Sequence, residues 1–109
     1  MLIEVLYIPG CCNHHPAVER LRRVLSAEAL ESPISEIPVN GEISVRTLQF
    51  PGSPTVRING IDVDPAPQAC FAVSCRLYSD GSGLPSEAIL QQAISVAKRQ
   101  DHGNNHITR

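Results

Sequence analysis

Tryptophan is absent from this sequence, and two tyrosines and two phenylalanines bring the aromatic residues to only 4% of the 109 residues. Base-stacking platforms for nucleic acids and aromatic cages for cations therefore have little material. An excess of basic charge is missing as well, because nine Lys and Arg residues face eleven Asp and Glu residues, for a net charge of −2. Phosphate binding needs a concentrated basic surface. We therefore expect no nucleic-acid partner.

Long apolar runs are also missing. The chain does not open with the basic residues and extended apolar stretch of a signal peptide, and no segment approaches the roughly 20 apolar residues that cross a bilayer. We expect a cytoplasmic protein with no membrane partner. Hydrophobic residues nevertheless make up 42% of the chain, so a chain of about one domain's length can build one core from Ile, Leu, Val and Ala.

The apolar pattern divides the first half of the chain into strands and helices. Residues 2–8 are almost continuously apolar and rich in β-branched side chains, which is typical of a strand buried on both faces. Apolar residues at helical spacing predict an amphipathic helix over Pro16–Leu30, with the proline in its first turn. Residues 34–39 form a short second strand. For residues 42–50 we favour a short helix over irregular structure.

The second half begins with a predicted hairpin. Two short apolar runs, 54–58 and 61–64, flank Asn59-Gly60, which is the strongest short-range hairpin signal in a sequence. The two strands are therefore expected to be antiparallel. Because Asp62 and Asp64 alternate along the second strand, we expect their side chains to face solvent.

An irregular connection over residues 66–83 leads to the last predicted helix, which spans Pro85–Arg99. Residues 100–109 are polar and aperiodic, so we expect a flexible tail after a single domain over residues 1–99. The resulting order is β-α-β-(α)-β-β-α. It predicts the α/β class, with a four-stranded mixed sheet that has helices on both faces.

Four cysteines are present, and in a reducing compartment they are more often catalytic, metal-binding or buried than disulfide-bonded. Cys11 lies between the first strand and the first helix, where free N–H groups and the positive end of the helix dipole stabilise a thiolate. We expect it to be the most reactive thiol. A bond to Cys12 would be strained, because neighbouring Cα atoms lie ~3.8 Å apart and disulfides normally need ~4.4 Å or more. Cys12 either takes part in the chemistry or packs under the first helical turn.

Three motifs, together with the order of elements, resemble the thioredoxin fold. The motifs are Tyr7-Ile8-Pro9-Gly10-Cys11, Gly52-Ser53-Pro54-Thr55-Val56-Arg57-Ile58-Asn59-Gly60 and Ser74-Cys75-Arg76-Leu77-Tyr78. They are most similar to small bacterial thioredoxin-like proteins with a Gly-Cys-x-x-His active-site loop. The resemblance covers roughly residues 2–98. It implies a thiol–disulfide or glutathione-linked oxidoreductase without a cofactor, acting on protein or low-molecular-weight thiols and disulfides.

The resemblance implies that Cys11 is the nucleophile of a Cys-x-x-Cys motif whose second cysteine is replaced by His14. His14 would then tune the thiolate; alternatively, His14 and His15 are both exposed at the start of the helix. The resolving thiol is left open between Cys70, Cys75 and an external thiol such as glutathione. In a thioredoxin-like fold the connection before the last helix passes near the active-site loop, which favours Cys75.

The resemblance also implies that Pro54 follows a cis peptide bond and faces Cys11. The backbone of Ser53 would then be exposed and would bind an extended peptide substrate by strand addition. The alternative is a trans proline that only begins a strand.

Metal binding is the competing interpretation. Cys11, Cys12, His14 and His15 place two thiols and two imidazoles within five residues, a donor set suited to Cu(I), Zn(II) or Hg(II). The chain lacks the second Cys-x-x-Cys or His pair that is typical of structural zinc sites. A soft-metal binding protein without catalysis remains the alternative to redox chemistry.

Overall fold

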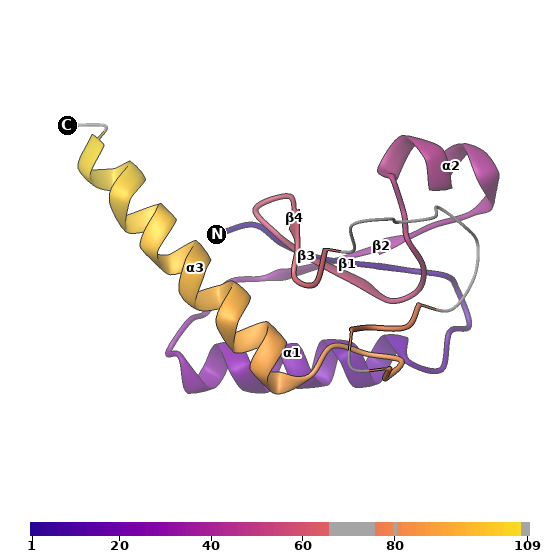
Figure 1. Ribbon diagram of the computed structural model, residues 1–109, viewed down its shortest axis with the longest axis horizontal. Coiled ribbons are helices and arrows are strands. Elements are labelled where there is room, and N and C mark those ends of the chain that lie inside the picture. The colour runs from indigo at the N-terminus through magenta and orange to yellow at the C-terminus, as the bar shows by residue number, and fades with distance from the viewer. Residues whose placement is uncertain (66–75, 80, 108–109) are drawn as a thin grey trace.

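A computed structural model of the protein describes residues 1–65, 76–79 and 81–107. These residues contain four strands and three helices (Figure 1). In chain order they are β1 (Ile3–Tyr7), α1 (His14–Ala27), β2 (Ile34–Pro38), α2 (Gly41–Leu48), β3 (Thr55–Ile58), β4 (Ile61–Asp62) and α3 (Glu87–Ile107).

The strands form one open mixed sheet in the order β2-β1-β3-β4. β1 and β2 are parallel, with α1 as the crossover between them, and β1 pairs antiparallel with β3. β3 and β4 are antiparallel and are joined at Asn59-Gly60, where both residues have positive φ values of 54° and 80°. A two-residue hairpin turn of this kind requires positive φ at both positions. The predicted α/β class, mixed sheet and hairpin are therefore confirmed.

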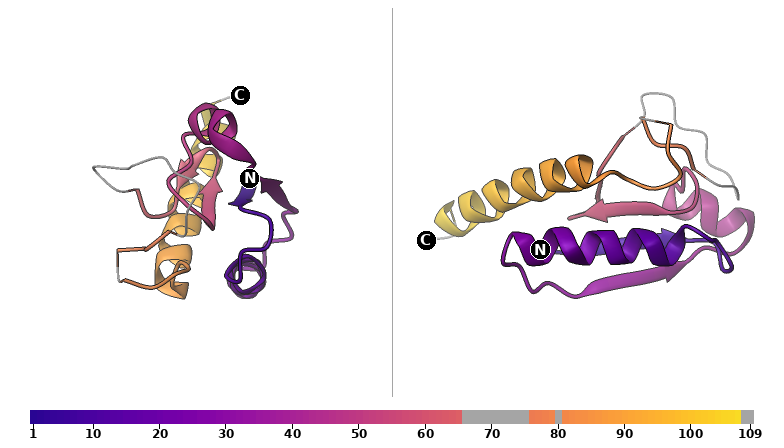
Figure 2. Two further views of the ribbon diagram at one scale, coloured as in Figure 1. Left: turned by 90° about the vertical axis from the view of Figure 1, so that its right-hand side faces the viewer. Right: turned by 90° about the horizontal axis from the view of Figure 1, so that it is seen from below.

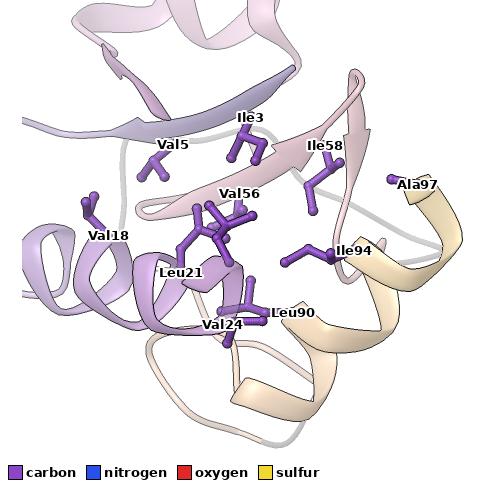
Figure 3. Packing of buried hydrophobic residues seen from close by; sticks show 11 residues of the cluster. Ile3, Val5, Val18, Leu21, Val24, Val56, Ile58, Leu90, Ile94 and Ala97 are labelled. Carbon is purple, nitrogen blue, oxygen red and sulfur yellow. The ribbon is translucent and has the colours of Figure 1, made fainter. Parts of the chain in front are cut away.

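Apolar side chains project from both faces of β1, as predicted for its continuous apolar run. On one face the sheet packs against α1 and α3, and on the other against α2 (Figure 1, Figure 2). Figure 3 shows the larger cluster, to which α1 contributes Leu21, α3 contributes Leu90 and β3 contributes Val56. The smaller cluster consists of Leu6, Val39, Val45 and Phe50.

α2 confirms the short helix that was favoured for residues 42–50. The last helix differs from its prediction, because α3 continues to Ile107 instead of ending at Arg99, into the segment predicted as a tail. Residues 100–106 carry no apolar side chain, so periodicity gave no signal there, although a helix that has already formed extends at low cost. Among the helices of the described residues, none is long and apolar enough to cross a membrane.

α1 ends in a Schellman motif built around a residue other than glycine. The N–H of Leu30 donates to the carbonyl of Leu25 (2.9 Å), and the N–H of Ala29 donates to that of Ser26 (3.0 Å). Ala29 has a φ of 56°, in the left-handed region that disfavours residues with a Cβ atom. Leu30 then packs on the larger core cluster, as is usual for this motif.

The conformation of Ala29 yields a stability prediction. Ala29→Gly should raise the free energy of unfolding by about 0.5 to 1 kcal/mol, because glycine is the preferred residue at this position of the motif. Ala27→Gly, two residues earlier and within α1, should lower it by a similar amount. Urea denaturation of both variants measures the two changes. Equal destabilisation by both substitutions would contradict the assignment.

Candidate functional site

A tight turn delivers Cys11 to the start of α1. The N–H of Cys11 donates to the carbonyl of Ile8 (3.0 Å) across Pro9-Gly10. Gly10 has a φ of 88°, and proline followed by a residue of positive φ is the pattern of a type II turn. The Pro9-Gly10 pair therefore sets the path from β1 into the loop that carries Cys11.

Cys11 and Cys12 both have free thiols, but their surroundings differ. Cys11 is half-buried and Cys12 is exposed, so Cys12 does not pack under the first helical turn. Within the described part of the chain, the hydrogen bonds of Cys11 are made by its backbone: besides the turn to Ile8, its carbonyl accepts from the N–H of His14 (3.2 Å).

His14 is buried and held on two sides. Its ring stacks on Tyr7 with the centroids 3.6 Å apart, and its Nε2 lies 2.6 Å from Oε1 of Glu36 on β2, where it donates to the carboxylate. His15 is exposed, as one interpretation expected, and its ring stacks on that of His14 at 4.7 Å. For His14, however, the expectation of exposure is wrong. Glu36 was not identified from the sequence, because its partner is 22 residues away.

The Ser53–Pro54 segment lies beside the Cys11 turn. The peptide bond between Ser53 and Pro54 is cis, and the Oγ of Ser53 accepts a hydrogen bond from the N–H of Ile8 (2.9 Å). Ile8 thus connects both segments, because its carbonyl also accepts from Cys11. The structure therefore links the turn of Cys11 to Ser53 through the backbone of Ile8.

The expected exposure of the Ser53 backbone is wrong, since Ser53 is 0% exposed. Its carbonyl accepts from the backbone N–H of Arg76 (3.0 Å). The neighbouring carbonyls are bonded as well, Gly52 to the hydroxyl of Thr55 (2.6 Å) and Pro54 to the hydroxyl of Tyr78 (2.6 Å). Residues 76–78 therefore lie where the sequence predicted a free backbone.

Arg76 carries a buried charge that is paired with Asp62. Its Nη1 and Nη2 donate to the two carboxylate oxygens of Asp62 at 2.7 and 3.0 Å, and Nη2 also donates to the carbonyl of Asp64 (2.6 Å). The expectation that Asp62 faces solvent is thus wrong: its side chain is only 16% exposed. Alternation along β4 could not reveal this, because Arg76 comes from outside the sheet.

The guanidinium keeps its charge in this setting. Burial by itself lowers the pKa of Arg76, but the hydrogen bond with Asp62 and the nearby Tyr78, Asp62 and Asp64 raise that pKa above its ordinary value. The guanidinium also lies over the ring of Tyr78, 4.2 Å from its centroid, in the geometry of a cation–π contact.

Gly52 allows the close approach of the Arg76 backbone. A Cβ atom at this position would lie 2.9 Å from Cβ of Arg76 and 3.0 Å from its Cα. The φ of Gly52 is 140°, which also favours glycine over other residues. Any side chain here would push the segments of Gly52 and Arg76 apart.

Two of the predicted cysteines, Cys70 and Cys75, lie outside the described residues. The metal interpretation can be compared with the part of the chain that is described: there, no group of three or more His, Cys, Asp or Glu side chains is placed to hold a metal ion. Cys11, Cys12, His14 and His15 are therefore not assembled as a ligand set in this structure.

Comparison of the chain with protein-family models, with curated proteins and with solved structures gives no match.

The Arg76–Asp62 pair yields a second stability prediction. Asp62→Asn should lower the free energy of unfolding by about 2 to 4 kcal/mol, because a buried charge that loses its partner is strongly destabilising. Glu28→Gln is the matched control. It removes the carboxylate from the more exposed pair with Lys98 (3.2 Å), and such pairs contribute about 1 kcal/mol or less. Urea denaturation compares them, and an equal effect of both substitutions would contradict the buried pair.

Tyr78 yields a prediction for the dependence of stability on pH. Burial raises the pKa of Tyr78 far above its ordinary value, which is about 10 in an unfolded chain. The neutral phenol therefore stabilises the fold fully below about pH 10, and this contribution is lost as the pH rises further toward the folded-state pKa.

The variant Tyr78→Phe isolates this effect. At pH 7 it should be less stable by about 1 to 2 kcal/mol, because the buried carbonyl of Pro54 loses its donor. Above about pH 10 the difference from the natural protein should shrink, since only the natural protein then loses the phenol contribution. Urea denaturation at several pH values measures the difference. A constant difference between pH 8 and pH 11 would contradict the prediction.

Proposed function

We propose that the chain is a thioredoxin-like protein that carries out thiol–disulfide exchange through Cys11. The order of elements and the strand order β2-β1-β3-β4 support this fold. The observation that carries the function is the connection made by Ile8, which bonds both the turn of the free thiol Cys11 and Ser53 before the cis bond to Pro54. Ile8 thus links the turn that ends at the proposed nucleophile to the Ser53–Pro54 segment.

The first step is attack of the Cys11 thiolate on a disulfide of the form R–S–S–R′. A bond forms between Sγ of Cys11 and one sulfur, the S–S bond breaks, and its electron pair leaves on R′–S⁻, which takes a proton from water. The product is a mixed disulfide between Cys11 and R. The position of Cys11 just before α1 favours this step, because the first N–H groups and the dipole of a helix stabilise a nearby thiolate.

The second step needs another thiol. We propose Cys75, which would attack Sγ of Cys11, release R–S⁻ and leave a disulfide between the two cysteines, so that the pair supplies two electrons. Support comes from its sequence neighbour Arg76, whose N–H bonds to Ser53. An external thiol would instead attack the sulfur of R and regenerate the Cys11 thiolate. Both routes are balanced and need no cofactor.

His14 is proposed to tune the Cys11 thiolate as a positioning residue. It replaces the second cysteine of a Cys-x-x-Cys motif, and its hydrogen bond to Glu36 and its stacking on Tyr7 hold the ring. Because the carbonyl of Cys11 accepts from the N–H of His14, holding this histidine also holds the loop that carries the thiol.

Substitution of each cysteine tests the function. Cys11→Ser should abolish the thiol-dependent reduction of bis(2-hydroxyethyl) disulfide, whereas Cys12→Ser should keep most of it, because the turn that Ile8 links to Ser53 ends at Cys11 and not at Cys12. The rate of exchange with a low-molecular-weight thiol as reductant is the measurement. A Cys11→Ser variant with full activity would falsify the proposal.

Alkylation supplies an independent readout on the natural protein. Cys12 is the more exposed thiol, so exposure alone predicts that iodoacetamide modifies Cys12 first. If the start of α1 activates Cys11, peptide mass spectrometry should instead find Cys11 modified first. Faster modification of Cys12 would argue against an activated Cys11.

A further inference from the structure

The backbone carbonyls of residues 52–54, near the Cys11 turn, already accept hydrogen bonds within the chain. An extended peptide pairs with a protein through backbone groups that are free at an edge. Here the carbonyls of Gly52, Ser53 and Pro54 all accept hydrogen bonds from within the chain, and Ser53 has no exposed surface. The partner of Ser53 is itself a backbone group, the N–H of Arg76, so this segment already takes the place of an added strand.

Residues 76–78, which cover Ser53, are held by further contacts on both sides of the hydrogen bond between Arg76 and Ser53. On one side, the side chain of Arg76 is held by Asp62 and by the carbonyl of Asp64. On the other, Tyr78 is buried, bonds Pro54 through its hydroxyl, and donates its N–H to the carbonyl of Ser82 (2.9 Å). A peptide that displaced the segment would have to leave the Arg76 charge without its partners.

The continuation of this segment lies against the start of α1. A Cβ atom on Gly83 would lie 2.5 Å from the side-chain amide nitrogen of Asn13, which is two residues after Cys11. Farther along, Nη1 of Arg20 donates to the carbonyl of Pro85 (2.9 Å). Residues 76–79 and 81–85 thus border the Cys11 site along the Ser53–Pro54 segment and the first turns of α1.

From these contacts we infer that Cys11 acts on low-molecular-weight disulfides and thiols, and that it does not bind an extended polypeptide by strand pairing. The inference rests on the proposed function of Cys11. A small disulfide needs only access to a half-buried sulfur, whereas a peptide would also need backbone partners that Arg76 and Tyr78 already occupy. The substrate is therefore chosen by the sulfur chemistry and the size of the molecule.

Two disulfides, one without and one with peptide groups, test the inference on the natural protein. One is bis(2-hydroxyethyl) disulfide, which has no peptide groups. The other joins 2-mercaptoethanol to the cysteine of an unstructured ten-residue peptide. The rate constant for formation of the mixed disulfide on Cys11 is measured for each by mass spectrometry. We expect the peptide disulfide to react no faster than about three times the rate of the small one, because pairing adds nothing.

The outcomes separate the inference from the proposed function. If the peptide disulfide reacts more than about threefold faster, strand pairing occurs and the inference is overturned, while exchange through Cys11 stands. If Cys11 reacts with neither disulfide, both the inference and the proposed function are overturned.

In the Asp62→Asn variant, which removes a charged partner of Arg76, the ratio of the peptide rate to the small-disulfide rate should rise. If this variant does not fold, Tyr78→Phe, which frees the carbonyl of Pro54, replaces it; an unchanged ratio in the folded variant would contradict the inference.

Discussion

The buried pair between Arg76 and Asp62 holds together parts of the chain that share no regular secondary structure. A guanidinium with little exposure keeps its charge only if carboxylate and carbonyl oxygens surround it, and β4 with the residues after it supplies them. With its side chain held there, Arg76 brings its backbone against Gly52 and Ser53. The conformation of the loop before β3, and hence one wall of the candidate site, depends on this pair.

The same pair explains how one face of a small sheet is closed. α1 and α3 cover the first face with apolar side chains, whereas α2 contributes only a small apolar cluster to the second. Near β3 and β4 the second face carries polar contacts: Nη1 of Arg76 bonds Thr55 and Asp62, and the hydroxyl of Tyr78 bonds the carbonyl of Pro54. Polar groups can cover a sheet in this way when their buried side-chain atoms are bonded, and no buried side-chain N or O atom of the described residues is without a partner.

The candidate site combines two kinds of construction. The Pro9-Gly10 turn that presents Cys11 is local, and its geometry follows from the residue types in it. The surroundings of the turn are assembled from distant segments: Ile8 bonds Ser53, and His14 bonds Glu36. The local turn thus sets the path of the loop, and long-range hydrogen bonds decide which side chains lie around it.

Periodicity and turn chemistry by themselves determined the order of elements, the hairpin at Asn59-Gly60 and the place of Cys11 before α1, because each depends on residues a few positions apart. The mixed sheet followed from that order and from the general rules for connecting strands. Only the tertiary structure decided that His14 is buried and bonds Glu36, that Asp62 pairs with Arg76, and that the Ser53 carbonyl accepts a hydrogen bond from the N–H of Arg76. These contacts join residues that are 14 to 23 positions apart. A polar side chain in a sequence shows what it can bond, and the fold alone shows which partner comes within reach.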